Sequence, residues 1–242
     1  MTVALVTGAS RGIGEATAVG LARRGLDVVI NYRDKQARAD RVVERIRAAG
    51  GQAVAIRADL TEPAAVESMV ARTVREFGRL DRLVLNASGG LERDAPADYA
   101  TQLNCVAQVR LADLAVEQMT SGGRIVFVTS HEAHFHGAGE TLSEYAPVAA
   151  SKRAGEDALL ERAPGYAERG VSLVVVSGDL IDGTITAKLL DRARPGLIEQ
   201  RRAEAGYLPS VDTFAAEVVR ATLAAGPDPL ILVGETRPVP DR

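Results

Sequence analysis

A glycine-rich loop near the start of the chain is the first group of residues whose spacing has a chemical meaning. Residues 7–14 read TGASRGIG and place Gly8, Gly12 and Gly14 between a short apolar run and a helical pattern. Glycines at this spacing allow a tight turn, a close approach of the backbone to a pyrophosphate, and close packing of a helix on a strand. The first turn of the following helix offers free N–H groups and a positive potential to phosphates. The loop therefore predicts a dinucleotide-binding site.

Short apolar runs alternate with helical patterns along the whole chain. Seven runs rich in β-branched residues are apolar almost throughout, which is typical of strands covered on both faces. Segments between them carry apolar residues at helical spacing, as in residues 66–77. This alternation predicts an α/β fold, with one Rossmann-type domain over residues 1–242 and a doubly wound parallel seven-stranded sheet with helices on both faces. The seven runs are residues 3–6, 27–30, 52–56, 82–85, 124–128, 171–176 and 229–233.

The composition argues against several classes of function. The 242 residues include 29 basic and 32 acidic side chains, which give a formal net charge of −3. We find no basic block of the kind that binds nucleic acid, no apolar stretch long enough to cross a membrane, and no signal-peptide pattern at the start. The single cysteine, Cys105, allows no internal disulfide and fits a reducing compartment. We therefore expect a cytoplasmic protein.

Two further motifs, together with the glycine loop, resemble the short-chain dehydrogenase/reductase superfamily. The loop matches T-G-x-x-x-G-I-G, Asp59 follows the third run, and Asn86-Ala87 follows the fourth, in the family's order over essentially the whole chain. The resemblance implies that Asp59 lies beside the adenine ring of a nicotinamide dinucleotide and that Asn86 and Ala87 line this cofactor. The family's usual motif is Asn-Asn-Ala-Gly, and residues 85–88 of this chain, Leu-Asn-Ala-Ser, match only its two central residues. The cofactor-binding residues implied in these motifs are Gly8, Ser10, Arg11, Gly12, Ile13, Gly14, Asp59, Leu60, Asn86, Ala87 and Ser88.

The end of the second strand indicates which form of the cofactor binds. Sites for NAD place a carboxylate there to bind the ribose 2′-hydroxyl, whereas this chain has Tyr32 at that position, followed by Arg33. Arg33 can pair with a 2′-phosphate in a bidentate manner. Arg11, inside the glycine loop, is a second cation of the kind that NADP-preferring relatives carry. Simple solvation of both arginines is the alternative, but together the two positions predict NADP(H).

The resemblance also implies a set of catalytic residues, one of which is missing from its usual place. In the family, a serine orients the substrate carbonyl and a tyrosine donates a proton to it. A lysine four residues after the tyrosine holds the nicotinamide ribose and lowers the pKa of the tyrosine, and an asparagine lies on a preceding helix. Asn104, Ser130 and Lys152 match the asparagine, the serine and the lysine. Val148 stands at the tyrosine position, and a valine cannot donate a proton.

Tyr145 offers a displaced proton donor, because it gives the spacing Tyr-x6-Lys with Lys152. This spacing resembles the enoyl-thioester reductase branch of the superfamily, which reduces a C=C bond conjugated to a carbonyl. Spacings of four and seven both return to one face of a helix, and the longer one moves the phenol about 4.5 Å along the axis. Pro147 favours the first helical turn and disfavours the α region for Ala146. We therefore expect Tyr145 to lie just before the helix.

The residues after the sixth strand also match this branch. Ser177-Gly178 replaces the usual Pro-Gly, and some enoyl reductases with the seven-residue spacing share Ser-Gly. Thr184 is implied as a contact of the nicotinamide amide or a phosphate. Residues 184–207 lie where the family's substrate lid is found, and such a lid excludes water from the reaction. The arginines of this segment fit a solvated surface, with an anionic or carrier-bound substrate as the alternative.

All three histidines of the chain follow Ser130 closely, in a connection that is longer than in the family pattern. They are His131, His134 and His136. The sequence H-E-A-H lacks the spacing of the helical zinc motif H-E-x-x-H, so we expect no metal. His131 and His134 are candidates for substrate contact or for a substitute proton donor. A polar loop that lines a pocket is the alternative.

Three functions fit these residues. The first is an NADPH-dependent reductase of an enone or enoyl thioester that uses Tyr145 and Lys152. The second is a ketone or imine reductase in which a histidine, or the substrate itself, supplies the proton. The third is a catalytically inactive NADP(H)-binding sensor or scaffold. Family members pair through the helices around residues 96–120 and 147–168, so the resemblance also implies a homodimer or homotetramer.

Overall fold

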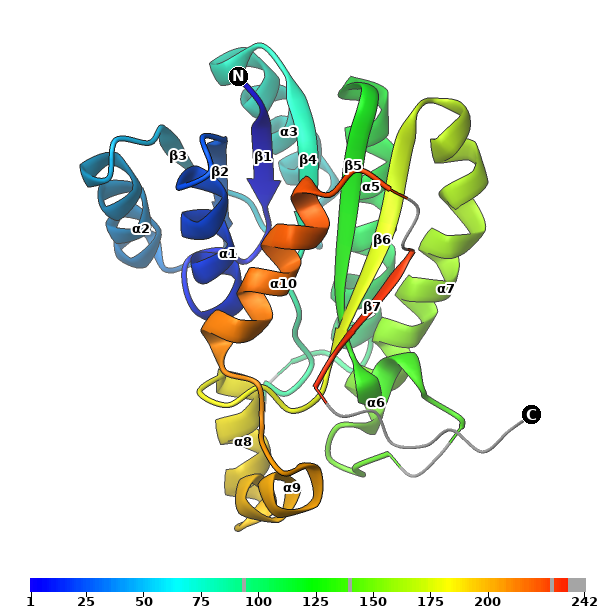
Figure 1. Cartoon of the computed structure of the whole chain (residues 1–242). Helices are drawn as coiled ribbons and strands as arrows, with labels where there is room; N and C mark the ends of the chain where they lie inside the picture. Colours follow the sequence, from blue (N-terminus) through cyan, green and yellow to red (C-terminus); the bar gives the residue numbers. More distant parts are fainter. Residues whose placement is uncertain (93–94, 139–140, 227–228, 235–242) are drawn as a thin grey trace.

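A parallel sheet forms the centre of the computed structural model, which describes residues 1–92, 95–138, 141–226 and 229–234. Its seven strands follow the order β3-β2-β1-β4-β5-β6-β7, and every pair is parallel (Figure 1). This order confirms the doubly wound Rossmann-type sheet predicted from the sequence. The strands are β1 (Val3–Val6), β2 (Asp27–Tyr32), β3 (Ala53–Arg57), β4 (Leu80–Leu85), β5 (Met119–Ser130), β6 (Val171–Gly178) and β7 (Leu230–Val233).

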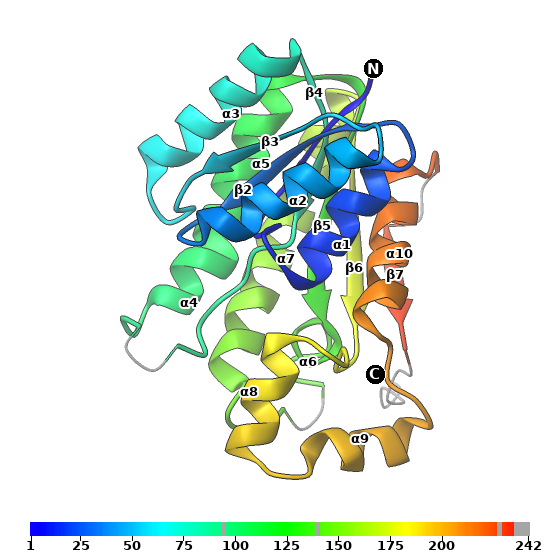
Figure 2. The same ribbon diagram turned by 90° about the vertical axis from the view of Figure 1, so that its left-hand side faces the viewer.

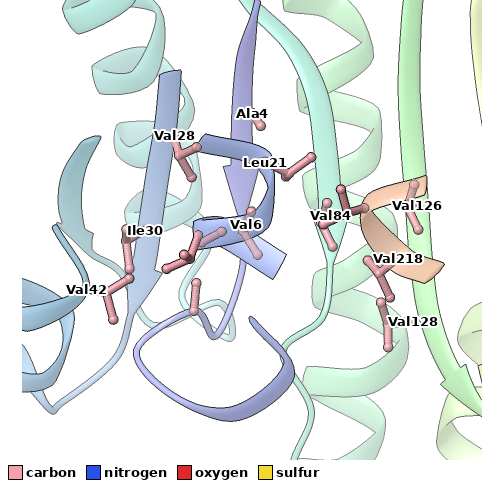
Figure 3. Packing of buried hydrophobic residues seen from close by; sticks show 14 of the residues in the cluster. Ala4, Val6, Leu21, Val28, Ile30, Val42, Val84, Val126, Val128 and Val218 are labelled. Carbon is pink, nitrogen blue, oxygen red and sulfur yellow. The ribbon is translucent and has the colours of Figure 1, made fainter. Parts of the chain in front are cut away.

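Helices cover both faces of the sheet because successive residues of a strand point to opposite sides. In β1, Ala4 and Val6 belong to one buried apolar cluster and Leu5 belongs to another. Leu21 and Val218 pack from two helices onto the strand valines of the first cluster (Figure 3). No helix of the described residues combines the length and apolar character that a membrane span needs. One face is covered by α1 (Gly12–Ala22), α2 (Gln36–Ala48) and α10 (Val211–Leu223), the other by α3 (Pro63–Phe77), α5 (Ala107–Gln118) and α7 (Ala146–Glu168).

The carboxyl ends of the strands carry the remaining short elements. The chain winds outward in opposite directions from β1 and β4, and open α/β sheets bind ligands at such a switch point. Both views show α6, α8 and α9 beyond the strand ends, with α8 and α9 inside the expected lid segment (Figures 1 and 2). These short elements are α4 (Tyr99–Thr101), the π-helical turn η1 (Gln102–Val106), α6 (His131–His134), α8 (Ile185–Ala193) and α9 (Leu197–Ala205).

The start of α7 bears on the displaced tyrosine. Tyr145 directly precedes the helix, as the sequence predicts, and occupies its N-cap position. The expectation that Pro147 excludes Ala146 from the helix is wrong, because α7 begins at Ala146. Pro147 then lies in the first turn, where its missing N–H has no helical partner to lose.

Helix α7 crosses η1 at Gly155, and this contact leaves no room for a side chain. A Cβ atom at this position would lie 2.3 Å from the carbonyl oxygen of Asn104 and 3.1 Å from Cys105 Cα. We expect Gly155→Ala to lower the free energy of unfolding by about 2 kcal/mol, because the helix must move away from η1. Urea unfolding followed by circular dichroism measures this change.

Gly165→Ala on the same helix is the matched control. A Cβ atom there would meet no atom within 4 Å. Alanine should then stabilise the protein by about 0.5–1 kcal/mol, because glycine is the poorer helix former. Equal stability of the two variants would contradict the close crossing of α7 and η1.

Candidate active site

A cavity of about 1010 Å³ opens at the carboxyl ends of the strands. It brings together most of the residues predicted from the sequence, although these are spread along much of the chain. Four predicted residues do not line it, namely Asn104, His131, His134 and Ser177. Those that do are Gly8, Ser10, Arg11, Gly12, Ile13, Gly14, Tyr32, Arg33, Asp59, Leu60, Asn86, Ala87, Ser88, Ser130, Tyr145, Lys152, Gly178 and Thr184.

The glycine loop forms one wall of the cavity, and its glycines allow a left-handed backbone and close packing. Gly8 and Gly12 have φ angles of 61° and 58°, in the left-handed region that favours glycine. A Cβ atom at Gly14 would lie 2.6 Å from Asn86 Nδ2 and 2.7 Å from the carbonyl oxygen of Gly8. Helix α1 begins at Gly12, so the unpaired N–H groups of its first turn lie at this wall. The loop fits a bound pyrophosphate group.

Thr7 and Asn86 hold the glycine loop against the end of β4. The Thr7 hydroxyl accepts hydrogen bonds from the backbone N–H groups of Asn86 (2.9 Å) and Ala87 (3.0 Å). The side-chain amide of Asn86 donates to the carbonyl oxygen of Thr7 at 2.8 Å. Asn86 therefore supports the loop as well as lining the cavity.

Four cationic side chains border the cavity near the end of β2. Arg11 comes from the glycine loop, and Arg33, Lys35 and Arg38 come from the end of β2 and the start of α2. The sequence motifs predict Arg11 and Arg33 here, whereas no motif marks Lys35 and Arg38, which follow Arg33 by a few residues. Asp34 offsets part of this charge, because its carboxylate lies 2.8 Å from Arg33 Nε. The remaining positive charge favours a phosphate group.

Tyr99, which the sequence reasoning also missed, holds Arg33 at the cavity edge. Its hydroxyl accepts a hydrogen bond from the guanidinium of Arg33, whose Cζ lies 5.7 Å from the centre of the ring. Burial raises the pKa of the Tyr99 phenol, while the charge of Arg33 acts in the opposite direction. Together with the Asp34 carboxylate, this contact holds the Arg33 guanidinium at the cavity edge.

The hydroxyl groups of Ser130 and Tyr145 meet inside the cavity, at a distance of 3.3 Å. Ser130 ends β5, and Tyr145 is buried at the start of α7. Burial raises the pKa of Tyr145, and the hydrogen bond with Ser130 opposes this effect. The phenol therefore stays protonated at neutral pH, which is the form that a proton donor needs.

Val148, at the usual tyrosine position, does not line the cavity. It is buried in a small apolar cluster that also contains Tyr145 and Leu197. A Cβ atom at Gly90 would lie 3.1 Å from Val148 Cγ2, so the valine packs closely on the loop after β4. The side chain at position 148 is thus directed toward this loop, while Tyr145 reaches the cavity.

Lys152 contributes an amino group to the cavity from the second turn of α7. Its side chain is buried, and burial lowers its pKa to about 8. The negative charge of Glu156 acts in the opposite direction. The amino group is therefore charged at neutral pH and close to its titration range.

Asn104 lies in η1, where its side chain joins three parts of the chain. Its Nδ2 donates to the carbonyl oxygen of Gly89 and to the Ser151 hydroxyl, both at 2.9 Å. Its Oδ1 accepts from the backbone N–H of Gly89 at 3.1 Å. Asn104 is almost fully buried and clamps the loop after β4 to helix α7.

The two candidate histidines point to buried partners outside the cavity wall. His131 Nδ1 lies 2.8 Å from the Ser177 hydroxyl, and burial lowers the pKa of this imidazole to about 4. His134 Nδ1 lies 2.5 Å from Oε1 of the buried Glu156. Among the described residues, no group of three or more His, Cys, Asp or Glu side chains is arranged to hold a metal ion.

Helices α8 and α9 close the other end of the cavity with an apolar surface and a charged edge. Leu190 and Leu197 line the cavity and are buried. Arg201 pairs with Asp179, at 3.0 Å between Nη2 and Oδ2, and so ties α9 to the chain after β6. Sequence reasoning did not identify Asp179 as the partner of this arginine. Thr184 caps α8, because its hydroxyl accepts a hydrogen bond from the Ala187 N–H at 3.1 Å.

Known proteins similar to this chain include reductases from fungi and bacteria. The hydroxynaphthalene reductase of Aspergillus fumigatus is 45% identical over 136 residues, which are 53% of this chain and 49% of that protein. The 1-cyclohexenylcarbonyl-CoA reductase of Streptomyces collinus is 34% identical over 186 residues, 74% of this chain and 65% of that protein. The matched part of the chain thus spans about half to two thirds of the length of these curated relatives.

Solved structures share the whole fold. A short chain dehydrogenase from Burkholderia cenocepacia, determined in complex with NADP, is 30% identical with a TM-score of 0.78, and the match covers 96% of each chain. Residues 2–194 also match the sequence model of the short chain dehydrogenase family. With the parallel sheet and the glycine loop, this match shows that the chain belongs to the short-chain dehydrogenase/reductase family.

Proposed function

We propose that the protein is an NADPH-dependent reductase that adds hydride to a conjugated C=C bond or a carbonyl, with Tyr145 as the proton donor. The observation that carries the proposal is the meeting of Tyr145, Ser130 and Lys152 in one cavity with the glycine loop. A sensor or scaffold would need the loop and Lys152 to bind cofactor, but it would have no use for a buried phenol beside a serine hydroxyl.

NADP(H) fits the residues that border the cavity, and when bound it supplies the hydride. Gly14 lets the start of α1 pack closely on Gly8 and Asn86, and the start of α1 suits the pyrophosphate. Arg11 and Arg33 suit a 2′-phosphate, with Lys35 and Arg38 as further cations nearby. Lys152 suits the hydroxyl groups of the nicotinamide ribose.

Ser130 and Tyr145 have different roles at the substrate oxygen. The Ser130 hydroxyl orients this oxygen by a hydrogen bond, and the Tyr145 hydroxyl gives up its proton to it. The positive charge of Lys152 in the same cavity favours the phenolate that Tyr145 becomes. Burial makes this electrostatic interaction stronger than it would be in water.

The position of Tyr145 favours a conjugated C=C bond as the group that is reduced. Hydride then adds at the β-carbon, and the proton goes to the oxygen of the resulting enolate, further from the site of hydride transfer than in a ketone. The tyrosine lies before α7 rather than within it, and the related cyclohexenylcarbonyl-CoA reductase is named for such a substrate. Reduction of a ketone is the second candidate, supported by the Ser130–Tyr145 hydroxyl pair.

The substrate is a small or carrier-bound molecule with an apolar body, in keeping with the apolar cavity wall on α8 and α9. Ile185, Leu190 and Leu197 supply this wall, and the segment 184–207 serves as a lid. As the family resemblance implies, we further propose a homodimer or homotetramer in the cytoplasm.

Tyr145→Phe tests the displaced donor. We expect kcat to fall by about 100-fold or more, because general acid catalysis by a positioned side chain has at least this size. NADPH oxidation against enones, enoyl thioesters and ketones measures the change. Tyr166→Phe removes a hydroxyl that bonds Asp113 outside the cavity wall and should leave kcat unchanged. An active Tyr145→Phe enzyme would refute the role, and tight NADPH binding without turnover by the wild type would favour the sensor.

Arg33→Ala tests the choice of cofactor. We expect the Kd for NADPH to rise by about 10-fold, because a charge-assisted pair with the 2′-phosphate is lost. The Kd for NADH should stay the same, since NADH has no phosphate at this position. Arg72→Ala, on α3 outside the cavity, is the control. Equal weakening of NADPH and NADH would argue against Arg33 as a phosphate ligand, and fluorescence titration distinguishes the outcomes.

A further inference from the structure

A carboxylate that the proposed reaction does not use lies buried next to the active site. Glu156 is fully buried in α7, one helical turn after Lys152 and therefore on the same side of the helix. An isolated charge in a protein interior is costly unless hydrogen bonds or an opposite charge compensate it. The groups that contact Glu156 are therefore important for holding this buried carboxylate in place.

His134 is the direct partner of this carboxylate. Its Nδ1 lies 2.5 Å from Glu156 Oε1, and its side chain is only 16% exposed. Arg153 Nη1 lies farther from the same oxygen, at 3.7 Å. This guanidinium also donates to the carbonyl oxygen of His134 (2.7 Å) and pairs with Asp157 (2.6 Å). Glu156 Oε2 has no hydrogen bond within the described part of the chain.

Neighbouring elements bring further titratable groups. Glu132 of α6 accepts a hydrogen bond from the Leu142 N–H at 3.2 Å. Gly155 packs against Asn104 and Cys105 of η1, and burial raises the pKa of the Cys105 thiol, which keeps it protonated. On α6, burial lowers the pKa of His131 to about 4, which keeps this imidazole neutral at physiological pH. His134 and Arg153 contact the carboxylate directly, and Lys152 lies one helical turn before it.

Lys152 needs such a partner, because burial alone acts against its positive charge. Its pKa falls to about 8, and the carboxylate of Glu156 opposes the fall. A cavity lysine that lost its proton at neutral pH would no longer favour the phenolate of Tyr145. The charge of Lys152 thus depends on a residue outside the cavity wall.

We propose that His134 fixes the position of the Glu156 carboxylate, and that Glu156 in turn keeps the Lys152 ammonium charged inside the cavity. Glu156 and His134 are then positioning residues that act through Lys152. The family's catalytic residues include no histidine, and His134 would act here through its contact with Glu156. It rests on Lys152 being part of the proposed active site.

The titration of Lys152 can be measured directly, because the chain has only three lysines: Lys35, Lys152 and Lys188. NMR of protein labelled with ¹³C at lysine Cε follows each amino group through a pH series, and Lys152→Arg identifies the signal by its loss. We expect the wild-type midpoint near pH 8. Glu156→Gln should lower the midpoint by about one pH unit, because an opposite charge nearby is removed.

Asp157→Asn is the matched control, since it removes the same charge from the next residue, whose side chain is 53% exposed. Its Lys152 midpoint should stay at the wild-type value. An unchanged midpoint in Glu156→Gln would overturn the proposal. An equal shift in Asp157→Asn would also overturn it, because the effect would then belong to the general charge of the helix.

Two variants of His134 test its contact with Glu156. Both retain Glu156, so the experiment remains possible even if Glu156→Gln does not fold. His134→Asn retains an N–H donor near the position of Nδ1, whereas His134→Leu has none. Without a donor at this place the Glu156 carboxylate is no longer held on the Lys152 side of the helix, and the Lys152 midpoint should fall. We expect this fall in the leucine variant only, and equal midpoints in both variants would overturn the role of His134.

The measurement uses free protein, without substrate or cofactor. A failure to find turnover would therefore count against the proposed reaction, while an unaltered Lys152 titration would count against this inference.

Discussion

The parallel pairing of the strands is the constraint on which the site depends, because parallel strands deliver their carboxyl ends to one edge of the sheet. Gly8, Asn86, Ser130 and Gly178 follow or end four different strands, and all of them line one cavity. Such a sheet must be covered on both faces, which places its polar edge beside two apolar clusters. The titratable groups of the cavity, Tyr145 and Lys152, are therefore largely shielded from water, and their protonation depends on a few neighbouring residues.

Burial favours the neutral form of both Tyr145 and Lys152, because it raises the pKa of the phenol and lowers the pKa of the amino group. For Tyr145 this keeps the phenol protonated, which is the form that the proposed proton donor needs. For Lys152 it works against the positive charge that the proposed mechanism uses. The hydrogen bond with Ser130 opposes the effect of burial on the pKa of Tyr145. The charge of Glu156 opposes the effect of burial on the pKa of Lys152.

The fold and the phosphate-binding wall could be predicted because their signals are local. Apolar periodicity identified every strand of the sheet, and glycine spacing identified the loop. Pro147 placed Tyr145 before the helix correctly and misplaced Ala146, since the first helical turn tolerates the residue before a proline. The directions of the histidines could not be read in this way. His131 meets Ser177, 46 residues away, and His134 meets Glu156, 22 residues away, and only the packing of α6 on α7 and β6 brings these pairs together.

Val148 has a consequence for redesign of the site. A Cβ atom at Gly90 would lie 2.7 Å from Ala100 Cβ and 3.1 Å from Val148 Cγ2, so the loop after β4 is closely packed beside this valine. The family's common four-residue spacing would be recreated by Val148→Tyr, and the much larger side chain would have to be accommodated next to this loop. A single substitution at position 148 would therefore change the packing of the loop together with the chemistry of the cavity.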